Sequence, residues 1–459
     1  MIQRPCLPAL ALIVMAVSAP AMAAPKAASR PAPKPTAPPV PYTVRKGDTL
    51  FDLGKAYLSK PGDYRHVQRA NQISRPKGLK PGSTLRIDPD LLKTTPIAAR
   101  LSAFSGKVEI ETEGRRAPAQ LGMAIQEGQR VVTGPGAFAT FELEDASRVT
   151  LPSNTAIRVE RLRNVVMTNA PQRVFRLDEG RGTISATPNP DPNARFDVRT
   201  PVSISAVRGT EFRVSADQAA SDSAARAQTM VIKGAVAVAT ADAEPARDLA
   251  GAVQAGYGVS VAAGAVSAPV ALLPAPRLGE GGQTQGDKSV HFAVQPVTGA
   301  AAYRLQLSRD AGFVDLFAEA TQPGPAADFG ALENGTYFVR LTALDGGGLE
   351  GLPADYSFDR DLDVLEPGAS PTAQAEGKHR KFLFRWNAAG DGQRSYRFQL
   401  FTGAESSRPV VDQPGLSEPQ LTLVDLPPGT YGWRVSALRF KDGKVTEKVG
   451  PLQTLQIGR

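Results

Sequence analysis

The sequence predicts a mainly β, multidomain protein with a small βααβ module, then an all-β domain, then two β-sandwich domains. Three observations support this fold class. Two short strand patterns enclose two helix patterns within residues 42–92. Short alternating strand patterns, separated by turn residues, fill residues 102–264, where helix signals are nearly absent. A further strand pattern occurs twice at a spacing of 93 to 94 residues, which indicates two copies of one β-domain in residues 270–362 and 363–459.

Residues 1–23 have the features of a secretory signal peptide. Arg4 supplies a positive charge, residues 7–17 form an apolar core, and residues 21–23 form an Ala-x-Ala cleavage site. The apolar run is too short to span a membrane, and no other stretch approaches the length of a transmembrane helix. We therefore predict an exported protein of the periplasm or cell envelope, cleaved after Ala23.

The only cysteine, Cys6, lies inside this predicted signal, too early for a lipoprotein site. The mature chain is therefore predicted to have no disulfide, no thiolate–metal site and no cysteine nucleophile. Such an exported protein suits a bacterial envelope and depends on ordinary hydrophobic cores for its stability.

Positive charge is concentrated towards the N-terminus. Residues 1–100 contain 16 Lys and Arg and five Asp, which gives them a net charge of +11. The whole chain carries +8, so the remaining residues carry a net charge of −3. Residues 24–41, rich in Pro, Ala and Lys, are predicted to be an extended linker. A basic module favours an anionic wall polymer. Nucleic acid is the other interpretation of a basic patch, but predicted export and the lack of interleaved aromatic residues argue against it.

The first half of the module has the local signals of a strand followed by a capped helix. Residues 42–44 alternate like a short strand. Gly47 and Asp48 form a turn pair. Thr49 is placed to cap the first helix, and Asp52, three residues later, would complete a capping box.

The second half of the module has a second helix and a closing strand. Asp63 is expected to cap the second helix, and Pro81-Gly82 turns the chain into a strand at residues 84–87. Helical spacing selects the residues that are expected to face the core. They are Leu50, Leu53, Ala56 and Tyr57 in the first helix, and Tyr64, Val67 and Ala70 in the second.

This order of elements and residues resembles the LysM module, a small βααβ domain that binds N-acetylglucosamine-containing glycans. The resemblance covers residues 42–92 and rests on an aromatic-Thr-Val strand, Gly-Asp-Thr-Leu, Ala-Asn at the end of the second helix, and Pro-Gly-x-x-Leu-x-Ile. In that family the glycan groove lies between the loop after the first strand and the loop before the last one. The resemblance implies a glycan site formed by Gly47, Asp48, Thr49 and Leu50, facing Asn71, Gln72, Ile73, Leu79, Lys80 and Pro81.

An N-acetyl sugar offers amide and hydroxyl groups and one methyl group. Backbone groups of the glycine-containing loops can pair with the amide, and Leu50 and Ile73 can cover the methyl. The loop between the two helices, residues 58–62, is longer and richer in turn residues than the common pattern of the family. This difference bears on glycan preference. One module implies weak binding, so retention needs a polymeric wall or a second contact. A βααβ unit without a ligand is the alternative interpretation.

The all-β segment contains a fixed series of landmarks, of which Thr200-Pro201 and the run from Arg208 to Phe212 are the most specific. They resemble the periplasmic FecR domain over roughly the whole of residues 102–264. The best-known FecR proteins are transmembrane regulators of a sigma factor, and this chain shows no span or cytoplasmic segment that would carry that activity. The resemblance implies an exported β-domain that contacts another molecule. A sandwich, a roll and a β-helix would each produce the observed alternation.

Two residues in this segment carry specific expectations. Gly209 is predicted to occupy a turn with positive φ. Arg208 is expected to be a salt-bridged structural arginine, with ligand contact as the alternative.

The internal repeat pairs Tyr337 with Tyr431, each inside a Gly-Thr-Tyr-x-x-Arg run. That run resembles the penultimate strand of fibronectin type III-like or immunoglobulin-like sandwiches, and Trp386 would then be the core tryptophan of the second copy. The two tyrosines are expected to be core or corner residues, with stacking on a ligand as the alternative. Such domains act as spacers or docking surfaces, and the fold alone does not give a function.

The sequence argues against an enzyme. Its three histidines, at positions 66, 291 and 379, fall in three different predicted domains. No zinc-binding His pattern, Gly-x-Ser-x-Gly or Ser-x-x-Lys motif stands in a suitable context. Two carboxylates alone can serve a glycosidase, but residues such as Glu109 and Glu142 are expected on solvent-facing strand positions. We therefore predict no catalytic residue, no metal and no cofactor.

The leading interpretation is an exported scaffold or adaptor of the bacterial envelope. It would bind peptidoglycan through residues 42–92 and present residues 102–264 and 270–459 to an envelope protein partner. One alternative is an envelope sensor that signals through the FecR-like domain. The other is a weak wall hydrolase that uses carboxylates.

Overall fold

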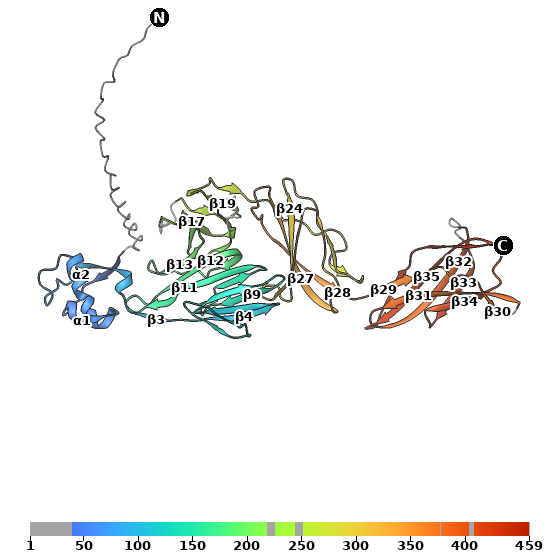
Figure 1. The fold of residues 1–459 in the computed structure, drawn as a ribbon, viewed down its shortest axis with the longest axis horizontal. Coiled ribbons are helices and arrows are strands. Elements are labelled where there is room, and N and C mark those ends of the chain that lie inside the picture. Colours follow the sequence, from blue (N-terminus) through green and yellow to red (C-terminus); the bar gives the residue numbers. More distant parts are fainter. Residues whose placement is uncertain (1–38, 218–224, 244–250, 377, 404–407, 459) are drawn as a thin grey trace, which may run out of the picture. The chain divides into compact units, whose positions relative to one another are not determined.

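The computed structural model describes residues 39–217, 225–243, 251–376, 378–403 and 408–458 (Figure 1). All of them belong to the compact unit formed by residues 37–459. The predicted signal peptide, with Cys6, and nearly all of the predicted linker lie outside the described residues. Within the described part of the chain, no helix is long and apolar enough to cross a membrane. The fold is mainly β, as predicted.

The first structural unit, here called the module, has the predicted βααβ order. Its elements are β1 (Val40–Thr43), α1 (Leu50–Tyr57), the 3-10 turn η1 (Pro61–Asp63), α2 (Tyr64–Ala70), β2 (Thr84–Ile87) and η2 (Pro89–Leu91). Strands β1 and β2 pair in antiparallel fashion. Thr49 caps α1 as predicted, because its side chain accepts a hydrogen bond from Asp52 N (3.1 Å) and donates one to Asp52 Oδ2 (2.6 Å).

Three details of the predicted helix faces are wrong. Ala56 and Ala70 are exposed, and Asp63 makes no side-chain cap on α2. Gly54 is buried in α1 instead. A Cβ at Gly54 would lie 2.7 Å from Pro61 O, so the close approach of η1 to α1 selects glycine there.

The second unit, here called the β-domain, consists of strands β3 to β21. The strands of its N-terminal half are β3 (Thr94–Pro96), β4 (Ala99–Ser105), β5 (Val108–Thr112), β6 (Arg115–Pro118), β7 (Ala124–Ile125), β8 (Arg130–Thr133), β9 (Phe138–Glu142), β10 (Arg148–Leu151), β11 (Thr155–Val165) and β12 (Ala170–Ser185). Those that follow are β13 (Arg195–Arg199), β14 (Ser203–Val207), β15 (Glu211–Asp217), β16 (Arg226–Lys233), β17 (Ala235–Thr240), β18 (Val253–Gln254), β19 (Tyr257–Ala262), β20 (Ala265–Val266) and β21 (Val270–Ala271).

The long strand β12 joins the two sheets of the β-domain. Its first part pairs with β11 and β13, and its last part, from Gly180, pairs with β10 and β15. The strands close into a barrel-like roll, and side chains of both sheets share one hydrophobic core. Gly180 has φ +86°, and a Cβ there would lie 2.5 Å from Asn154 O. Glycine therefore permits the change of sheet at this point.

The third unit, here called the first sandwich, has two sheets. Its strands are β22 (Thr284–Gln285), β23 (His291–Ala293), β24 (Ala302–Ser308), β25 (Leu316–Gln322), β26 (Ala326–Asp328), β27 (Gly335–Leu344) and β28 (Ala354–Arg360). The larger sheet has the order β22-β28-β27-β24-β25, and β23 pairs with β26. Its core contains Phe292, Leu305 and Phe358, each at most 1% exposed.

The fourth unit, here called the second sandwich, is built in the same way. Its strands are β29 (Val364–Pro367), β30 (Gln374–Glu376), β31 (His379–Ala389), β32 (Gln393–Thr402), β33 (Pro409–Leu416), β34 (Gln420–Val424), β35 (Gly429–Lys441), β36 (Lys444–Val449) and β37 (Gln453–Ile457). Strands β33-β32-β35-β36 form one sheet with β37, and β29-β31-β30 form the other with β34.

The aromatic residues of the two sandwiches lie where the sequence predicts. Trp386 is buried in the core of the second sandwich, where it and the fully buried Trp433 both stack on Phe398. The Tyr337 hydroxyl donates to Glu333 O (3.2 Å), and the Tyr431 hydroxyl donates to Pro427 O (3.0 Å). Both tyrosines therefore fasten a corner four residues upstream.

The first sandwich contacts the β-domain through a joint that we call the inner joint. Phe138 of β9 packs with Phe313 and Leu316 of the sandwich. Beside this apolar contact, Glu350 pairs with Arg213 of the β-domain (3.4 Å) and with Arg304 of its own sandwich. These side chains are buried, so the joint removes both apolar and charged groups from water.

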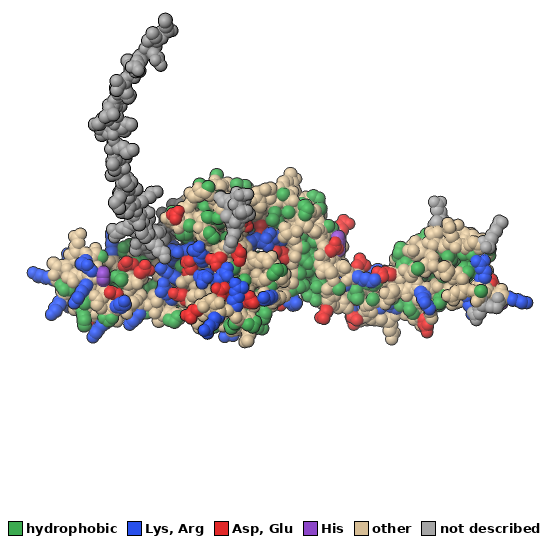
Figure 2. Space-filling view, in the orientation of Figure 1, with side chains coloured by type: hydrophobic (Ala, Val, Ile, Leu, Met, Phe, Trp, Pro, Cys, Tyr) green, Lys and Arg blue, Asp and Glu red, His purple; other side chains and the backbone are tan. Residues whose placement is uncertain are grey.

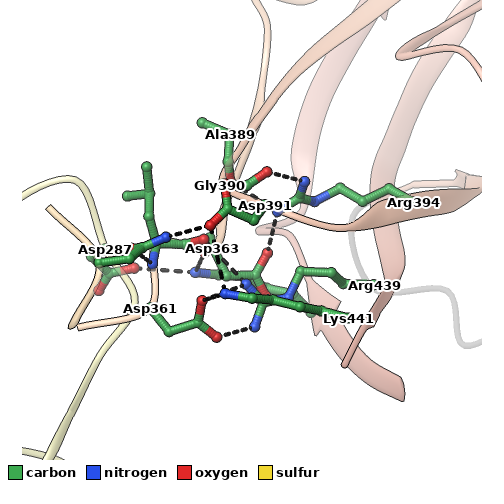
Figure 3. A network of polar contacts seen from close by, with 12 residues as sticks. Asp287, Asp361, Asp363, Ala389, Gly390, Asp391, Arg394, Arg439 and Lys441 are labelled. Carbon is green, nitrogen blue, oxygen red and sulfur yellow. Dashed lines mark hydrogen bonds and ion pairs between the residues drawn. The ribbon is translucent and has the colours of Figure 1, made fainter. Parts of the chain in front are cut away.

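The two sandwiches meet in a different way, at what we call the outer joint (Figure 3). Asp361, between β28 and β29, accepts hydrogen bonds from Arg439 Nη2 (2.6 Å) and Lys441 Nζ (2.7 Å) of β35. Asp363 accepts one from Arg394 Nη2 (3.0 Å). Lys448 of β36 pairs with Asp287 of the first sandwich (3.2 Å). The outer joint is thus a network of ion pairs.

Candidate functional site

The structure brings the two predicted groove loops together at one end of the module. Leu50 N, at the start of α1, donates to Pro76 O (3.0 Å). Gly82 N donates to Val44 O (2.8 Å), which joins the chain after β1 to the turn before β2. The loop at residues 47–50 therefore lies against the chain at residues 72–82.

Asp48 has a structural role inside its loop. Its Oδ2 accepts hydrogen bonds from the Tyr42 hydroxyl (2.9 Å) and from Arg45 N (2.7 Å). Burial of Tyr42 and its contact with Asp48 raise the pKa of that phenol to about 12. The carboxylate fixes the turn after β1, and it shapes the rim of the groove.

Asn71 also holds the module together. Its Nδ2 donates to Val67 O (2.8 Å) and Arg86 O (2.9 Å), and its Oδ1 accepts from Arg86 N (2.7 Å). The side chain thus fastens the end of α2 to β2, and all of these bonds would be lost on substitution with alanine.

One part of the predicted site needs correction. Leu50 is 0% exposed, because its side chain fills the core between the helices and the sheet, so it cannot cover the methyl group of a sugar. Ile73 and Leu79 are half-buried at the edge of the same core. Thr49 is half-buried and occupied by the cap on α1.

The remaining predicted residues are exposed. They are Gly47, Gln72, Lys80 and Pro81. Gln72 has φ +53°, which places it in a left-handed turn after α2. Sequence reasoning missed Pro76 and Gly78, which lie between Ile73 and Leu79 in the second predicted loop, where Pro76 O accepts from Leu50 N. The turn signal Pro-Lys-Gly at residues 76–78 is what could have indicated them.

The unusual loop between the helices is placed away from this end of the module. Leu58 forms a β-bridge with Leu92, and Ser59 Oγ donates to Leu92 O (2.9 Å). This loop follows the C-terminal end of α1, whereas the groove loops meet its N-terminal end. An eight-residue helix separates the two ends by about 12 Å.

The surface of the module is basic. Figure 2 shows Lys and Arg side chains distributed over it. The exposed cations are Arg45, Lys46, Lys55, Lys60, Arg65, Arg69, Arg75, Lys77, Lys80, Arg86 and Lys93. His66 is exposed and lies 3.2 Å from Arg69 Nη2. Among the described residues, no group of three or more His, Cys, Asp or Glu is arranged to hold a metal ion.

Comparison with protein families confirms both resemblances. Residues 42–88 match the LysM domain model, and residues 129–237 match the FecR protein model. The chain contains a LysM domain and a FecR domain. No curated protein sequence matches the chain.

Solved structures show weaker likenesses. A protein described as an anti-sigma factor, from Parabacteroides distasonis, is 17% identical over 31% of this chain and 59% of its own, with a TM-score of 0.24. The present chain thus spans less than two thirds of that structure. The FN1–FN3 domains of chicken CNTN1 are 12% identical over 56% of this chain and 93% of theirs, with a TM-score of 0.21. The fibronectin(III)-like modules of Clostridium thermocellum CbhA are 10% identical over 40% of this chain and 93% of theirs, with a TM-score of 0.18.

Proposed function

We propose that this protein is an exported scaffold of the bacterial envelope that binds peptidoglycan, or a related N-acetylglucosamine-containing glycan, through residues 42–92. The observation that carries the proposal is the pairing of the two groove loops, through Leu50 N and Pro76 O, inside the segment that matches the LysM domain. The predicted signal peptide supports export, and the basic surface of the module supports retention on an anionic wall.

The groove, without Leu50, still suits an N-acetyl sugar. Asp48 and Asn71 shape its walls, and the exposed backbone at Gly47 and Gln72 can pair with the amide and hydroxyl groups of the sugar. Ile73, at the edge of the core, supplies the apolar surface for the acetyl methyl group.

The β-domain and the two sandwiches would present surfaces to an envelope protein. We infer that the sandwiches are two copies of one fibronectin type III-like unit, because Tyr337 and Tyr431 fasten equivalent corners and follow equivalent strand patterns. We propose no catalytic residue, metal or cofactor. A sensor that acts through the FecR domain is the second candidate, and the match at residues 129–237 is the observation that favours it. This candidate requires an envelope partner that co-purifies with residues 102–264 alone, whereas a scaffold can also hold its partner through the two sandwiches.

The test of wall binding should block the groove and leave the fold intact. Alanine at Asp48 or Asn71 would remove structural hydrogen bonds, so a loss of binding would be ambiguous. A Cβ at Gly78 meets open space, and this glycine does not have a positive φ, so Gly78→Trp adds a ring beside the groove without backbone strain. Gly62→Trp is the matched control, because Gly62 is equally open and lies beyond the far end of α1.

The measurement is co-sedimentation of the mature protein with purified peptidoglycan sacculi. We expect the parent and Gly62→Trp to pellet with the sacculi and Gly78→Trp to remain in solution. Equal pelleting of all three proteins, or no pelleting of the parent, would overturn the proposal. Release of soluble muropeptides would instead identify a hydrolase.

A further inference from the structure

The β-domain contains a pocket whose charged lining is entirely cationic. It lies beside β12, β13 and the turn that ends in Gly209. Three arginines and no carboxylate line it, and Thr187 and Asn189 add polar groups. Its enclosed volume is about 20 Å³, so it is a small hollow with an open mouth.

Two of the three arginines belong to the floor of the pocket. Arg173 is 7% exposed, and its Nη1 donates to Asp145 Oδ2 (2.7 Å). Its Nε is buried and has no hydrogen-bond partner among the described residues. Arg195 is 8% exposed and pairs with Asp197. A buried N–H without an acceptor is costly, and Arg173 is one of the residues that line the pocket.

The third arginine stands at the exposed mouth. The sequence favoured a salt-bridged role for Arg208, but in the described part of the chain its side chain is exposed and forms no ion pair. Its backbone position is set by the next residue. Gly209 has φ +77°, as predicted, and a Cβ there would lie 2.6 Å from Pro188 Cα. This tight turn places Arg208 among the residues that line the pocket.

We propose that this pocket binds the carboxylate of a peptide. Arg208 would receive the carboxylate at the mouth, and Arg173 would supply the donor below it. A guanidinium matches the planar carboxylate by two parallel hydrogen bonds. The enclosed space admits a group of about the size of one carboxylate, so the residue that bears it would lie outside, at the open mouth. It is too small for a sugar ring.

The class of peptide follows from the other binding surface of the chain. This step rests on the proposed function: if the module holds glycan strands, the carboxylates presented beside it are those of the peptide stems of the wall. Two weak contacts on one polymer raise the overall affinity through effective concentration, which offsets the weakness of a single glycan module.

The test uses probes that contain no sugar, so its outcome is independent of the groove. The probes are an N-acetylated tripeptide that ends in D-alanine with a free carboxylate, and the same tripeptide as its C-terminal amide. Calorimetry or fluorescence anisotropy with the full mature chain measures each affinity. We expect saturable binding of the free acid and at least tenfold weaker binding of the amide.

Arg208→Ala is expected to weaken binding of the free acid at least tenfold, and Arg208→Lys to recover only part of it, because lysine lacks the bidentate fork. Both variants should unfold at the temperature of the parent, since Arg208 is exposed. Arg115→Ala, which removes an exposed arginine of β6, is the matched control and should bind as the parent does.

Equal binding of acid and amide, or unchanged binding by Arg208→Ala, would overturn the proposal. Inorganic phosphate that binds while the tripeptide does not would also overturn it, because the site would then accept free anions and no peptide. Failure of the proposed function appears separately, as loss of pelleting with sacculi while tripeptide binding persists.

Discussion

The inner and outer joints fasten the same sandwich by opposite means. At the inner joint Glu350, Arg213 and Arg304 are 5–6% exposed, and Phe138 packs beside them. At the outer joint the side chains of Asp361 and Lys441 are 33% and 26% exposed, although Arg439 between the two sandwiches is buried. Burial makes the inner joint sensitive to the loss of any one charge, whereas solvent screening makes the outer joint tolerant of such a loss.

The same strand position can therefore hold either a buried or an exposed ion pair. Arg304 of the first sandwich corresponds to Arg397 of the second by the 93-residue repeat. Arg304 is buried against Glu350 and the β-domain, whereas Arg397 is exposed and pairs with Asp412 at 2.7 Å. The repeat preserves the sheet, and the neighbour that covers the sheet decides what the arginine does.

The largest expected effect is at the inner joint. Glu350→Ala leaves the guanidinium groups of Arg213 and Arg304 buried without their shared carboxylate. Burial already lowers the pKa of Arg304 to about 9, so its charged form is costly there and yet persists at neutral pH. We expect the substitution to lower the free energy of unfolding of the β-domain and first sandwich by about 3–5 kcal/mol.

The two joints can be measured separately. Trp386 and Trp433 are the only tryptophans, and both lie in the core of the second sandwich, so tryptophan fluorescence follows that sandwich alone. Circular dichroism follows all of the strands. Glu350→Ala should shift the denaturation curve seen by circular dichroism and leave the fluorescence transition in place. A shift of less than about 1 kcal/mol would mean that water enters the inner joint and screens these charges.

A smaller, pH-dependent effect is expected at the outer joint. Burial alone would raise the pKa of Asp361, but hydrogen bonds from Arg439 and Lys441 outweigh it and hold that pKa below its usual value. A carboxylate whose pKa is lower in the folded state stabilises that state above its unfolded pKa, about 3.9. The stabilisation is lost as the pH falls through the folded pKa.

Asp361→Asn tests this expectation. The fluorescence transition of the variant should be less stable than that of the parent at pH 7, and the two should converge as the pH falls below about 4. A difference that persists at low pH would show that Asp361 acts through packing and not through its charge. The part of the circular dichroism change that does not coincide with the fluorescence transition reports the β-domain and the first sandwich, and it serves as the control because it should not change.

The sequence predicted the frame of each domain better than the joints between them. Thr49, Trp386, Tyr337 and Tyr431 were predictable because caps, core aromatics and corners depend on residues close in the sequence. Glu350 carried no such signal, because its partner Arg213 lies 137 positions away, in another domain.

The candidate site shows the same limit. Its loops were predictable from turn residues, but Leu50 was assigned to the groove although the helix turns it into the core. The exposure of Arg208 was not predictable either, since a salt bridge depends on which carboxylates the fold brings near.

The smallest effect is expected at the edge of the outer joint. Lys448 pairs with Asp287 at 3.2 Å, and the side chain of Asp287 is 87% exposed. An exposed pair of this kind contributes at most about 1 kcal/mol, and salt screens it further. Lys448→Ala should therefore shift the fluorescence transition by about 0.5 kcal/mol or less at low salt, and by less still at high salt. A shift as large as that of Asp361→Asn, unaffected by salt, would mean that the hydrogen bond from Lys448 Nζ to Asp363 O, and not the exposed ion pair, stabilises the joint. The contrast between the buried and the exposed joint would then depend on hydrogen-bond geometry and not on screening by solvent.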